Sequence, residues 1–118
     1  MKREQRLRSA ADFQRVRDQS PRAWPHRLLV LHLAPNELGY ARVGITVSGR
    51  VGKAVVRNRV RRRLREALRA RLGSLGTGYD VLVIARPPSA QASWLELNAA
   101  LDTVLQRASA TMSTGANV

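Results

Sequence analysis

The sequence predicts an α/β two-layer sandwich, in which helices pack on one sheet. Three observations support this prediction. Residues 27–33 and 79–86 are apolar runs of strand length, and residues 40–48 alternate between apolar and polar side chains. Residues 53–72 repeat apolar side chains at the spacing of a helix. Shorter helices are predicted near both ends of the chain, which gives the order α-β-β-α-β-α.

The first helix is predicted to begin after Ser9, because a serine hydroxyl can cap the first turn and Asp12 stands at the third helical position. It extends to about Asp18 and carries Phe13 and Val16 as its apolar side chains. The prolines at 21 and 25 then predict an irregular connection, since proline fixes φ and lacks the amide hydrogen.

The two strand-like segments that follow are separated by a short turn sequence. Residues 35–39 include proline, asparagine and glycine, the residue types that favour turns. Residues 27–33 and 40–48 are therefore predicted to form an antiparallel hairpin. The third strand, residues 79–86, is almost continuously apolar, as expected for a strand in the interior of a sheet.

The central and last helices each have a predicted buried face. In residues 53–72 the apolar stripe consists of Val56, Val60, Leu64, Ala67 and Leu68. Ser93 and Glu96 form a capping-box pattern that predicts the start of the last helix. Its apolar face consists of Leu97, Leu101, Val104, Leu105 and Ala108. Residues 109–118 are small or polar, which predicts a frayed tail after a single domain formed by residues 1–108.

The net charge points to a polyanionic partner. The 118 residues include 21 Lys and Arg against 8 Asp and Glu, a formal charge of +13. Lys2 and Lys53 are the only lysines. Guanidinium groups bind phosphates and stack on bases better than ammonium groups do, although a GC-rich genome produces the same bias. Binding of a nucleic acid would relieve the self-repulsion of so basic a domain. We therefore expect residues 1–108 to be one RNA-binding domain.

The positive charge is concentrated in the central helix. Residues 53–71 hold nine of the 21 basic residues and one acid, Glu66. On a helical wheel, one face opposite the apolar stripe collects Asn58, Arg61, Arg62, Arg65 and Arg69. A solvated basic helix usually interleaves opposite charges, and this one does not. A membrane-surface or calmodulin-binding helix is a further alternative, but the apolar stripe lacks Trp and Phe.

The sequence offers no protein-borne active site or metal site. The absence of cysteine excludes a disulfide, a zinc–thiolate site and a cysteine nucleophile, and fits a cytoplasmic protein. No apolar run approaches the roughly 20 residues of a membrane helix, and no signal peptide is visible. His26 and His32 have no third ligand at metal spacing, and the eight acids are scattered. We expect no catalytic and no metal-binding residue in the chain.

The segment GKAVVRNRVRRRLREALR, residues 52–69, resembles the signature of the protein subunit of bacterial ribonuclease P. Three flanking segments resemble the same family in the same order. They are Arg6-Leu7 with Asp12-Phe13, residues 42–48 before the signature and residues 79–86 after it. The resemblance extends from residue 2 to about residue 107.

The resemblance implies a non-catalytic subunit of a ribonucleoprotein endonuclease that removes the 5′ leader from precursor tRNA. The partner RNA carries out the hydrolysis with Mg²⁺, and no protein partner and no membrane are required. The fold would contain a left-handed β-α-β crossover around the arginine-rich helix, against the usual right-handed rule. The residues implied in binding the RNA subunit are Arg50, Lys53, Arg57, Asn58, Arg59, Arg61, Arg62 and Arg65. Those implied in binding the leader are Phe13, Arg17, Thr46 and Arg6.

The chain departs from the family pattern at three positions. Arg17 and Leu31 stand where family members often carry aromatic residues, and Gly49 replaces a common lysine. Leader binding would therefore depend more on charge than on stacking. Composition alone fits an alternative equally well, a structural RNA-binding protein such as a ribosomal component or an RNA chaperone with no role in cleavage. An autonomous nuclease is a third class, which the missing acidic or histidine cluster disfavours.

Overall fold

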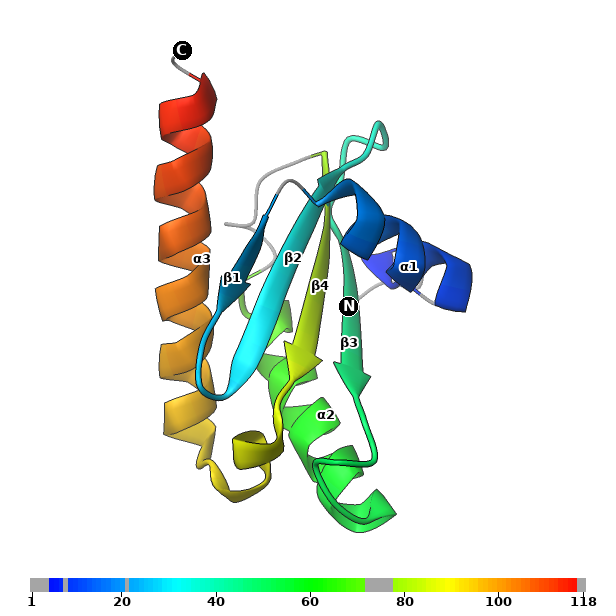
Figure 1. Ribbon diagram of the computed structural model, residues 1–118, viewed down its shortest axis with the longest axis vertical. Helices are drawn as coiled ribbons and strands as arrows, with labels where there is room; N and C mark the ends of the chain where they lie inside the picture. Colours follow the sequence, from blue (N-terminus) through cyan, green and yellow to red (C-terminus); the bar gives the residue numbers. More distant parts are fainter. Residues whose placement is uncertain (1–4, 8, 21, 72–77, 117–118) are drawn as a thin grey trace.

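The computed structural model describes residues 5–7, 9–20, 22–71 and 78–116. The elements follow in the order α1 (Ala10–Gln19), β1 (Ala23–Pro25), β2 (Leu29–Pro35), β3 (Arg42–Val47), α2 (Ala54–Arg69), β4 (Tyr79–Ala85), the 3-10 helix η3 (Pro87–Gln91) and α3 (Trp94–Ala116). The strands form one sheet in the order β1-β2-β4-β3. Helix α1 covers one face of this sheet, and α2 and α3 pack on the other (Figure 1). The predicted α/β fold is confirmed, with α1 on the face opposite the other two helices.

The predicted hairpin between residues 27–33 and 40–48 is wrong, because β4 lies between β2 and β3. β4 pairs antiparallel with β2 and parallel with β3, so that Val83 lies opposite Leu31 on one side and Ile45 on the other. The reason is that Val81, Leu82 and Val83 are all almost completely buried. A strand without a polar face needs cover on both faces and a neighbour on each side.

The parallel pair β3 and β4 is joined through α2. In the view of Figure 1 both strands run downward, β4 lies to the left of β3, and α2 lies behind the sheet. A connection with this arrangement is left-handed, whereas most β-α-β connections are right-handed. The crossover implied by the family resemblance is therefore present, and it places α2 against β3, the edge strand of the sheet. On its outer side β3 also pairs with the segment before α1, where the Leu7 amide donates to the Val43 carbonyl at 2.8 Å.

A short strand replaces the irregular connection that the prolines predicted. β1 pairs antiparallel with β2, with Trp24 opposite Leu31, and the Trp24 side chain is buried. Pro25 ends this strand at the edge of the sheet, where a missing amide hydrogen does not interrupt a ladder. The observed order is therefore α-β-β-β-α-β-α, one strand more than the sequence predicted.

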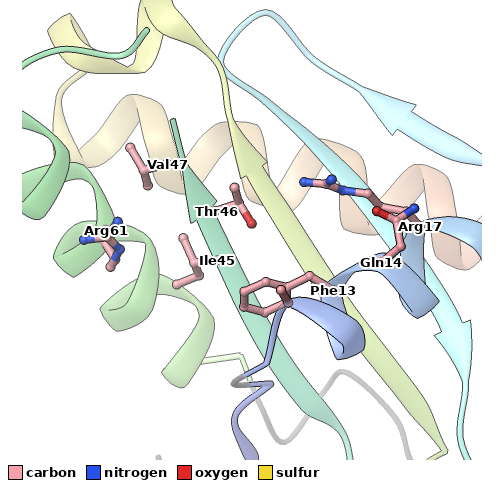
Figure 2. A pocket seen from close by; sticks show the side chains of 8 residues that line it. Phe13, Gln14, Arg17, Ile45, Thr46, Val47 and Arg61 are labelled. Carbon is pink, nitrogen blue, oxygen red and sulfur yellow. The ribbon is translucent and has the colours of Figure 1, made fainter. Parts of the chain in front are cut away.

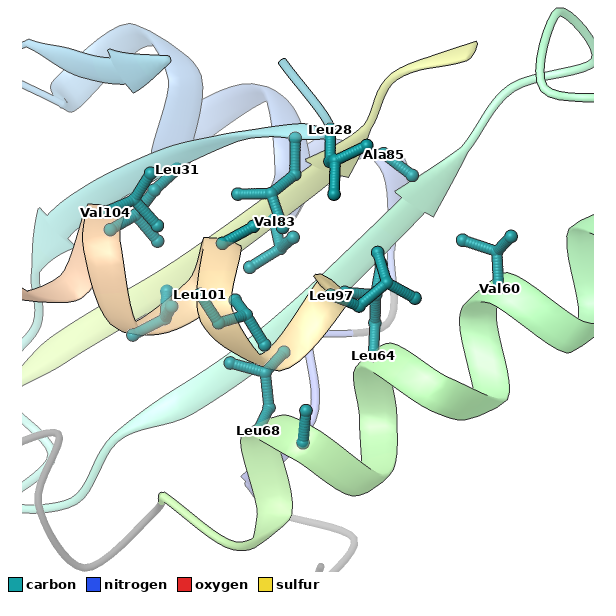
Figure 3. Packing of buried hydrophobic residues seen from close by; sticks show 14 of the residues in the cluster. Leu28, Leu31, Val60, Leu64, Leu68, Val83, Ala85, Leu97, Leu101 and Val104 are labelled. Atoms are coloured by element: carbon teal, nitrogen blue, oxygen red, sulfur yellow. The ribbon is translucent and has the colours of Figure 1, made fainter. Parts of the chain in front are cut away.

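The main core lies between the sheet and the two helices α2 and α3. The predicted stripe of α2 is buried at Val60, Leu64, Ala67 and Leu68, and Val56 packs against it in part. Leu97, Leu101 and Val104 of α3 pack beside it over Leu31 and Val83 (Figure 3). This packing fixes α2 on the sheet and directs its opposite side to solvent.

Both predicted helix starts are confirmed. The Ser9 hydroxyl accepts a hydrogen bond from the Asp12 amide at 3.0 Å. Ser93 and Glu96 form the reciprocal capping box, with the Glu96 amide donating to Ser93 Oγ at 3.1 Å and the Ser93 amide to Glu96 Oε1 at 2.9 Å. Helix α3 continues to Ala116, past the predicted end near Ala108. None of the described helices is long and apolar enough to span a membrane.

Candidate nucleic-acid interface

The outer face of α2 is a strip of exposed polar and basic side chains. We call this strip the α2 outer face, and its members are Asn58, Arg62, Arg65 and Arg69. Arg50 and Lys53 are exposed in and after the loop that precedes the helix. Lys53 at the N-cap makes no side-chain capping bond, and the first turn contains no acid. The positive end of the helix dipole thus adds to the basic side chains around it.

Two arginines of α2 turn from this face toward the protein. Arg59 Nη2 donates to the Ala90 carbonyl at 2.8 Å, and Arg63 Nη1 donates to the Ala92 carbonyl at 2.9 Å. Both side chains are half-buried, and they fasten the η3 segment to α2. Arg59 was predicted to bind RNA, and part of its guanidinium is already engaged within the protein. Arg57 is also half-buried, and its Nε lacks a hydrogen-bond partner among the described residues.

Asn58 has an intramolecular contact that the sequence did not reveal. Its Oδ1 accepts a hydrogen bond from Arg61 Nη1 at 3.0 Å, one turn further along α2. Asn58 itself is exposed on the α2 outer face. Asn58 therefore helps to hold Arg61, which is half-buried and lines a hollow with Ile45, Thr46 and Val47 of β3.

Two adjoining hollows lie between α1, β3 and α2, and we call them together the α1–β3 groove. The larger has a volume of about 390 Å³ and is lined by Ala10, Phe13, Gln14, Arg17, Ile45, Thr46, Val47 and Arg61. The smaller, of about 90 Å³, is lined by Arg6, Leu7, Phe13, Val43, Gly44, Ile45, Arg61 and Arg65. Phe13, Ile45 and Arg61 belong to both. In the view of Figure 2, the Phe13 ring lies beside Ile45, with Arg61 and Arg17 on opposite sides of β3.

The groove brings together the four residues predicted to bind the leader. Phe13, Arg17 and Thr46 line the larger hollow and Arg6 lines the smaller one. It also recruits Arg61 and Arg65, which were predicted to bind the RNA subunit. The border between the two predicted surfaces therefore runs along α2, and Arg65 lies on both.

Phe13 lies directly over Gly44 of β3. A Cβ atom built on Gly44 would stand 2.6 Å from Phe13 Cε1 and 3.0 Å from Leu7 Cβ. Any larger residue would displace the ring, so the glycine permits the close approach of α1 to the sheet. Thr46, two residues further along β3, has a shielded Oγ1 with no hydrogen-bond partner in the described part of the chain. A polar group left unsatisfied at such a position calls for a ligand or a solvent molecule.

His32 is a residue near the groove that sequence reasoning missed. The alternation of β2 buries Leu29, Leu31 and Leu33 in the core under α2 and α3, so His32 faces the α1 side. Burial lowers the pKa of His32, and the nearby positive charge of Arg17 lowers it further. Leu31, which stands where family members often carry an aromatic residue, faces away from the groove into the main core. The alternation of the strand was the signal that could have found His32.

The groove has the electrostatics of an anion site and lacks those of a metal site. Its lining includes four arginines and no carboxylate. Magnesium and calcium need oxygen ligands, chiefly carboxylates and carbonyls. No group of three or more His, Cys, Asp or Glu that could hold a metal ion occurs among the described residues. A chain of alternating phosphates and flat bases matches the lining better, because guanidinium groups and an aromatic ring are both present.

Comparison with known proteins decides the family. Residues 1–109 match the family model described as ribonuclease P. The chain belongs to the ribonuclease P protein family. It is 44% identical over 109 residues to the ribonuclease P protein component of Roseiflexus castenholzii, covering 92% of this chain and 88% of that one. It is also 44% identical over 108 residues to the component of Herpetosiphon aurantiacus, with 92% and 87% covered.

Solved structures of ribonuclease P proteins share the fold. The chain superposes on the Staphylococcus aureus RNase P protein with a TM-score of 0.80 and 33% identity, covering 88% of this chain and 94% of that one. The RNase P protein of Thermotoga maritima gives a TM-score of 0.77 at 28% identity, with 86% and 96% covered. The chain is thus the protein component of ribonuclease P, a ribonucleoprotein endoribonuclease of tRNA processing.

Proposed function

We propose that the chain docks on the catalytic RNA of ribonuclease P through one surface and holds the 5′ leader of precursor tRNA in another. The docking surface is the α2 outer face with Arg50, Lys53 and Arg57 at the start of the helix. The leader surface is the α1–β3 groove. The observation that carries this division is the groove itself, an arginine-lined hollow with one aromatic ring, which shares only Arg65 with the α2 outer face.

The groove lining suits a single-stranded chain. Phe13 offers a face on which one base can stack, a contact worth about 1–3 kcal/mol. Arg17 and Arg61 stand on either side of β3, and each can neutralise a phosphate (Figure 2). Thr46 Oγ1 has no hydrogen-bond partner among the described residues. It can bond to a sugar hydroxyl or a phosphate oxygen once the side chains that shield it move aside. Because the groove holds a single phenylalanine, charge supplies most of the binding in this proposal.

The α2 outer face suits a folded RNA. Exposed arginines along one helix side can follow a phosphate backbone, and the uncapped start of the helix adds backbone amides directed at anions. Arg59 and Arg63 support this face from behind by holding η3 against α2. In this proposal Arg59 keeps its remaining guanidinium donors for RNA, and Asn58 presents its free amide hydrogens beside them.

The chemistry of leader removal belongs to the RNA subunit in this proposal. The groove offers positive charge and one aromatic surface, and a residue set of this kind can bind and orient the leader but cannot hold Mg²⁺. Mg²⁺ supports the hydrolysis through the RNA subunit. The protein holds the leader so that the scissile phosphate, outside the groove, lies against that RNA. No further protein partner is required.

The test is cleavage of precursor tRNA by the reconstituted ribonucleoprotein at low Mg²⁺. Adding the chain to the catalytic RNA should raise the rate of leader removal, because leader binding compensates for the missing counterions. The alternative, a structural RNA-binding protein without a role in cleavage, predicts binding to RNA with no change in rate. An unchanged rate in the presence of a saturating amount of folded protein would contradict the proposal.

A variant of Phe13 separates leader binding from other effects. F13A should weaken binding of precursor tRNA by the holoenzyme about tenfold, because one base loses its stacking partner, and should leave binding of mature tRNA unchanged. The measurement is the ratio of the two dissociation constants. Equal weakening for both tRNAs would mean that Phe13 acts only by packing against the small apolar cluster under α1, which consists of Leu7, Val16, Ala34 and Leu82.

A further inference from the structure

The start of β4 carries a fully buried carboxylate, which the functions above do not use. Asp80 has a relative exposure of 0%. Side chains from three other parts of the chain converge on it: Arg15 of α1, Arg42 of β3 and Asn36 after β2. Burying a charge is costly unless it is paired and hydrogen-bonded, so a cluster of this kind is retained for a reason.

Both oxygens of Asp80 are fully occupied. Arg42 binds in a bidentate manner, with Nε to Oδ1 at 2.9 Å and Nη2 to Oδ2 at 2.7 Å. Asn36 Nδ2 donates to Oδ1 at 2.7 Å, and Arg15 Nη2 donates to Oδ2. Burial alone would raise the pKa of Asp80, but the hydrogen bonds from Arg42, Asn36 and Arg15 outweigh it and lower the pKa. The carboxylate is therefore charged throughout the neutral range.

Arg15 joins this cluster to the helix that forms the groove wall. Val16 is the one side chain of α1 that is fully buried. Apolar packing therefore holds this helix on the sheet mainly at one position. On a helix of roughly 100° per residue, Phe13 stands about 60° to one side of Val16 and Arg15 about 100° to the other. Phe13 and Arg17 are about 40° apart by the same geometry and share the groove side. The Arg15–Asp80 pair thus holds α1 on the flank opposite the groove.

We propose that Asp80 is a positioning residue for leader binding. Through Arg15 it fixes the rotation of α1 about Val16, and this rotation sets where Phe13 and Arg17 stand over β3. Asp80 touches neither leader nor RNA subunit. The proposal rests on the α1–β3 groove being the leader site. It adds that the Arg15–Asp80 pair fixes the width of this groove before the precursor tRNA binds.

The first experiment compares D80N with the matched control D102N in the reconstituted holoenzyme. Asp102 also pairs with an arginine, Arg71, at 2.8 Å, but on α3, and its side chain is 56% exposed. D80N should reduce the preference for precursor over mature tRNA about tenfold, because a misplaced ring and guanidinium lose contacts of that order. Its affinity for the RNA subunit should stay within about twofold of wild type, since the α2 outer face is untouched. D102N should change neither quantity.

The second readout is independent of tRNA. Phe13 is the only phenylalanine of the chain, so fluorophenylalanine gives a single ¹⁹F resonance from the groove. D80N should shift or broaden this resonance, and D102N should leave it in place. Wild-type protein that shows no leader preference would contradict the leader site, while a resonance that still moves in D80N would support the positioning role. The two hypotheses therefore fail separately.

Substitutions of Arg15 test the same proposal if the D80N protein does not fold. R15Q leaves Arg42 and Asn36 on the carboxylate and removes only the link to α1, from a side chain that is 31% exposed. It should reproduce the loss of leader preference and the change in the ¹⁹F resonance. R15K, which keeps the ion pair, should restore both toward wild type. A folded R15Q protein with wild-type leader preference and an unmoved resonance would overturn the proposal.

Discussion

At the scale of the residue, the contact between Phe13 and Gly44 sets the shape of the groove. G44A would place a methyl group 2.6 Å from the ring, so the ring or α1 must move. We expect a loss of about 1–3 kcal/mol in stability, as overpacking typically causes, together with a reduced preference for precursor tRNA. The measurements are urea unfolding and the ratio of dissociation constants for precursor and mature tRNA.

Gly49 offers the matched control for this substitution. A Cβ atom there meets nothing within 4 Å, so G49A introduces the same methyl group without a contact. G49A should leave stability within about 0.5 kcal/mol of wild type. If G44A and G49A gave the same leader preference, the close approach of Phe13 to β3 would not matter for binding.

His32 reports on Arg17 through its pKa. Burial and the charge of Arg17 lower the pKa of His32, so the imidazole is neutral at pH 7. R17Q should raise this pKa by removing the neighbouring charge, as seen in an NMR titration of the imidazole protons. Because the folded-state pKa is depressed, the unfolded chain takes up the proton first. The contribution to stability therefore declines as pH falls below about 6.5, and this decline should be smaller in R17Q.

At the scale of the element, α2 combines a buried stripe with a charged face. The periodicity of Val60, Leu64, Ala67 and Leu68 predicted both correctly, because helical spacing is a local property of the sequence. The helical wheel did not show that the arginines of α2 make different kinds of contact. Arg59 and Arg63 bind carbonyls near η3, and Arg61 turns into the groove. These contacts depend on partners about 30 residues away.

Salt dependence measures how many arginines of α2 meet phosphate. R62A and R69A should each lower the slope of log affinity for the catalytic RNA against log salt by about one unit, because each releases one counterion fewer. R22A removes an exposed arginine outside α2 and the groove, and it should leave the slope unchanged. Equal slopes for all the variants would place the RNA contact elsewhere on the protein.

The positions of three strands along the chain were predicted correctly, but their pairing in the sheet was not. Residues 29–35, 42–47 and 79–85 are strands as expected, since their apolar patterns are local. Their order is not local: β4 enters between β2 and β3 because it is the strand that is apolar on both faces. The short strand β1 escaped prediction because prolines flank Trp24, and its place depends on pairing with Leu31.

At the scale of the whole molecule, the sheet separates two kinds of contact. One face carries α2 and α3 and the main core, and the other carries α1 and the groove (Figure 1). The left-handed crossover places α2 beside the edge strand β3, so its arginines reach both the outer face and the groove. Sequence reasoning separated the two surfaces completely. The structure instead gives them a shared border at Arg61 and Arg65.

The sequence analysis named four of the residues that line the groove as leader-binding, but it did not show what holds them in place. Phe13, Arg17 and Thr46 were predicted from resemblance to the family, and they line one hollow. The Asp80 cluster joins residues 15, 36, 42 and 80, which no local pattern connects. Such tertiary contacts between distant positions become visible only when the strands and helices are assembled.

Crosslinking from defined positions tests the central claim most directly. The chain has no cysteine, so Q14C in the groove and R62C on the α2 outer face each give a single site for a photoreactive group. Both side chains are exposed. In the holoenzyme bound to precursor tRNA, Q14C should crosslink to the 5′ leader and R62C to the catalytic RNA. Crosslinks from Q14C to the catalytic RNA alone, or from R62C to the leader alone, would contradict the account.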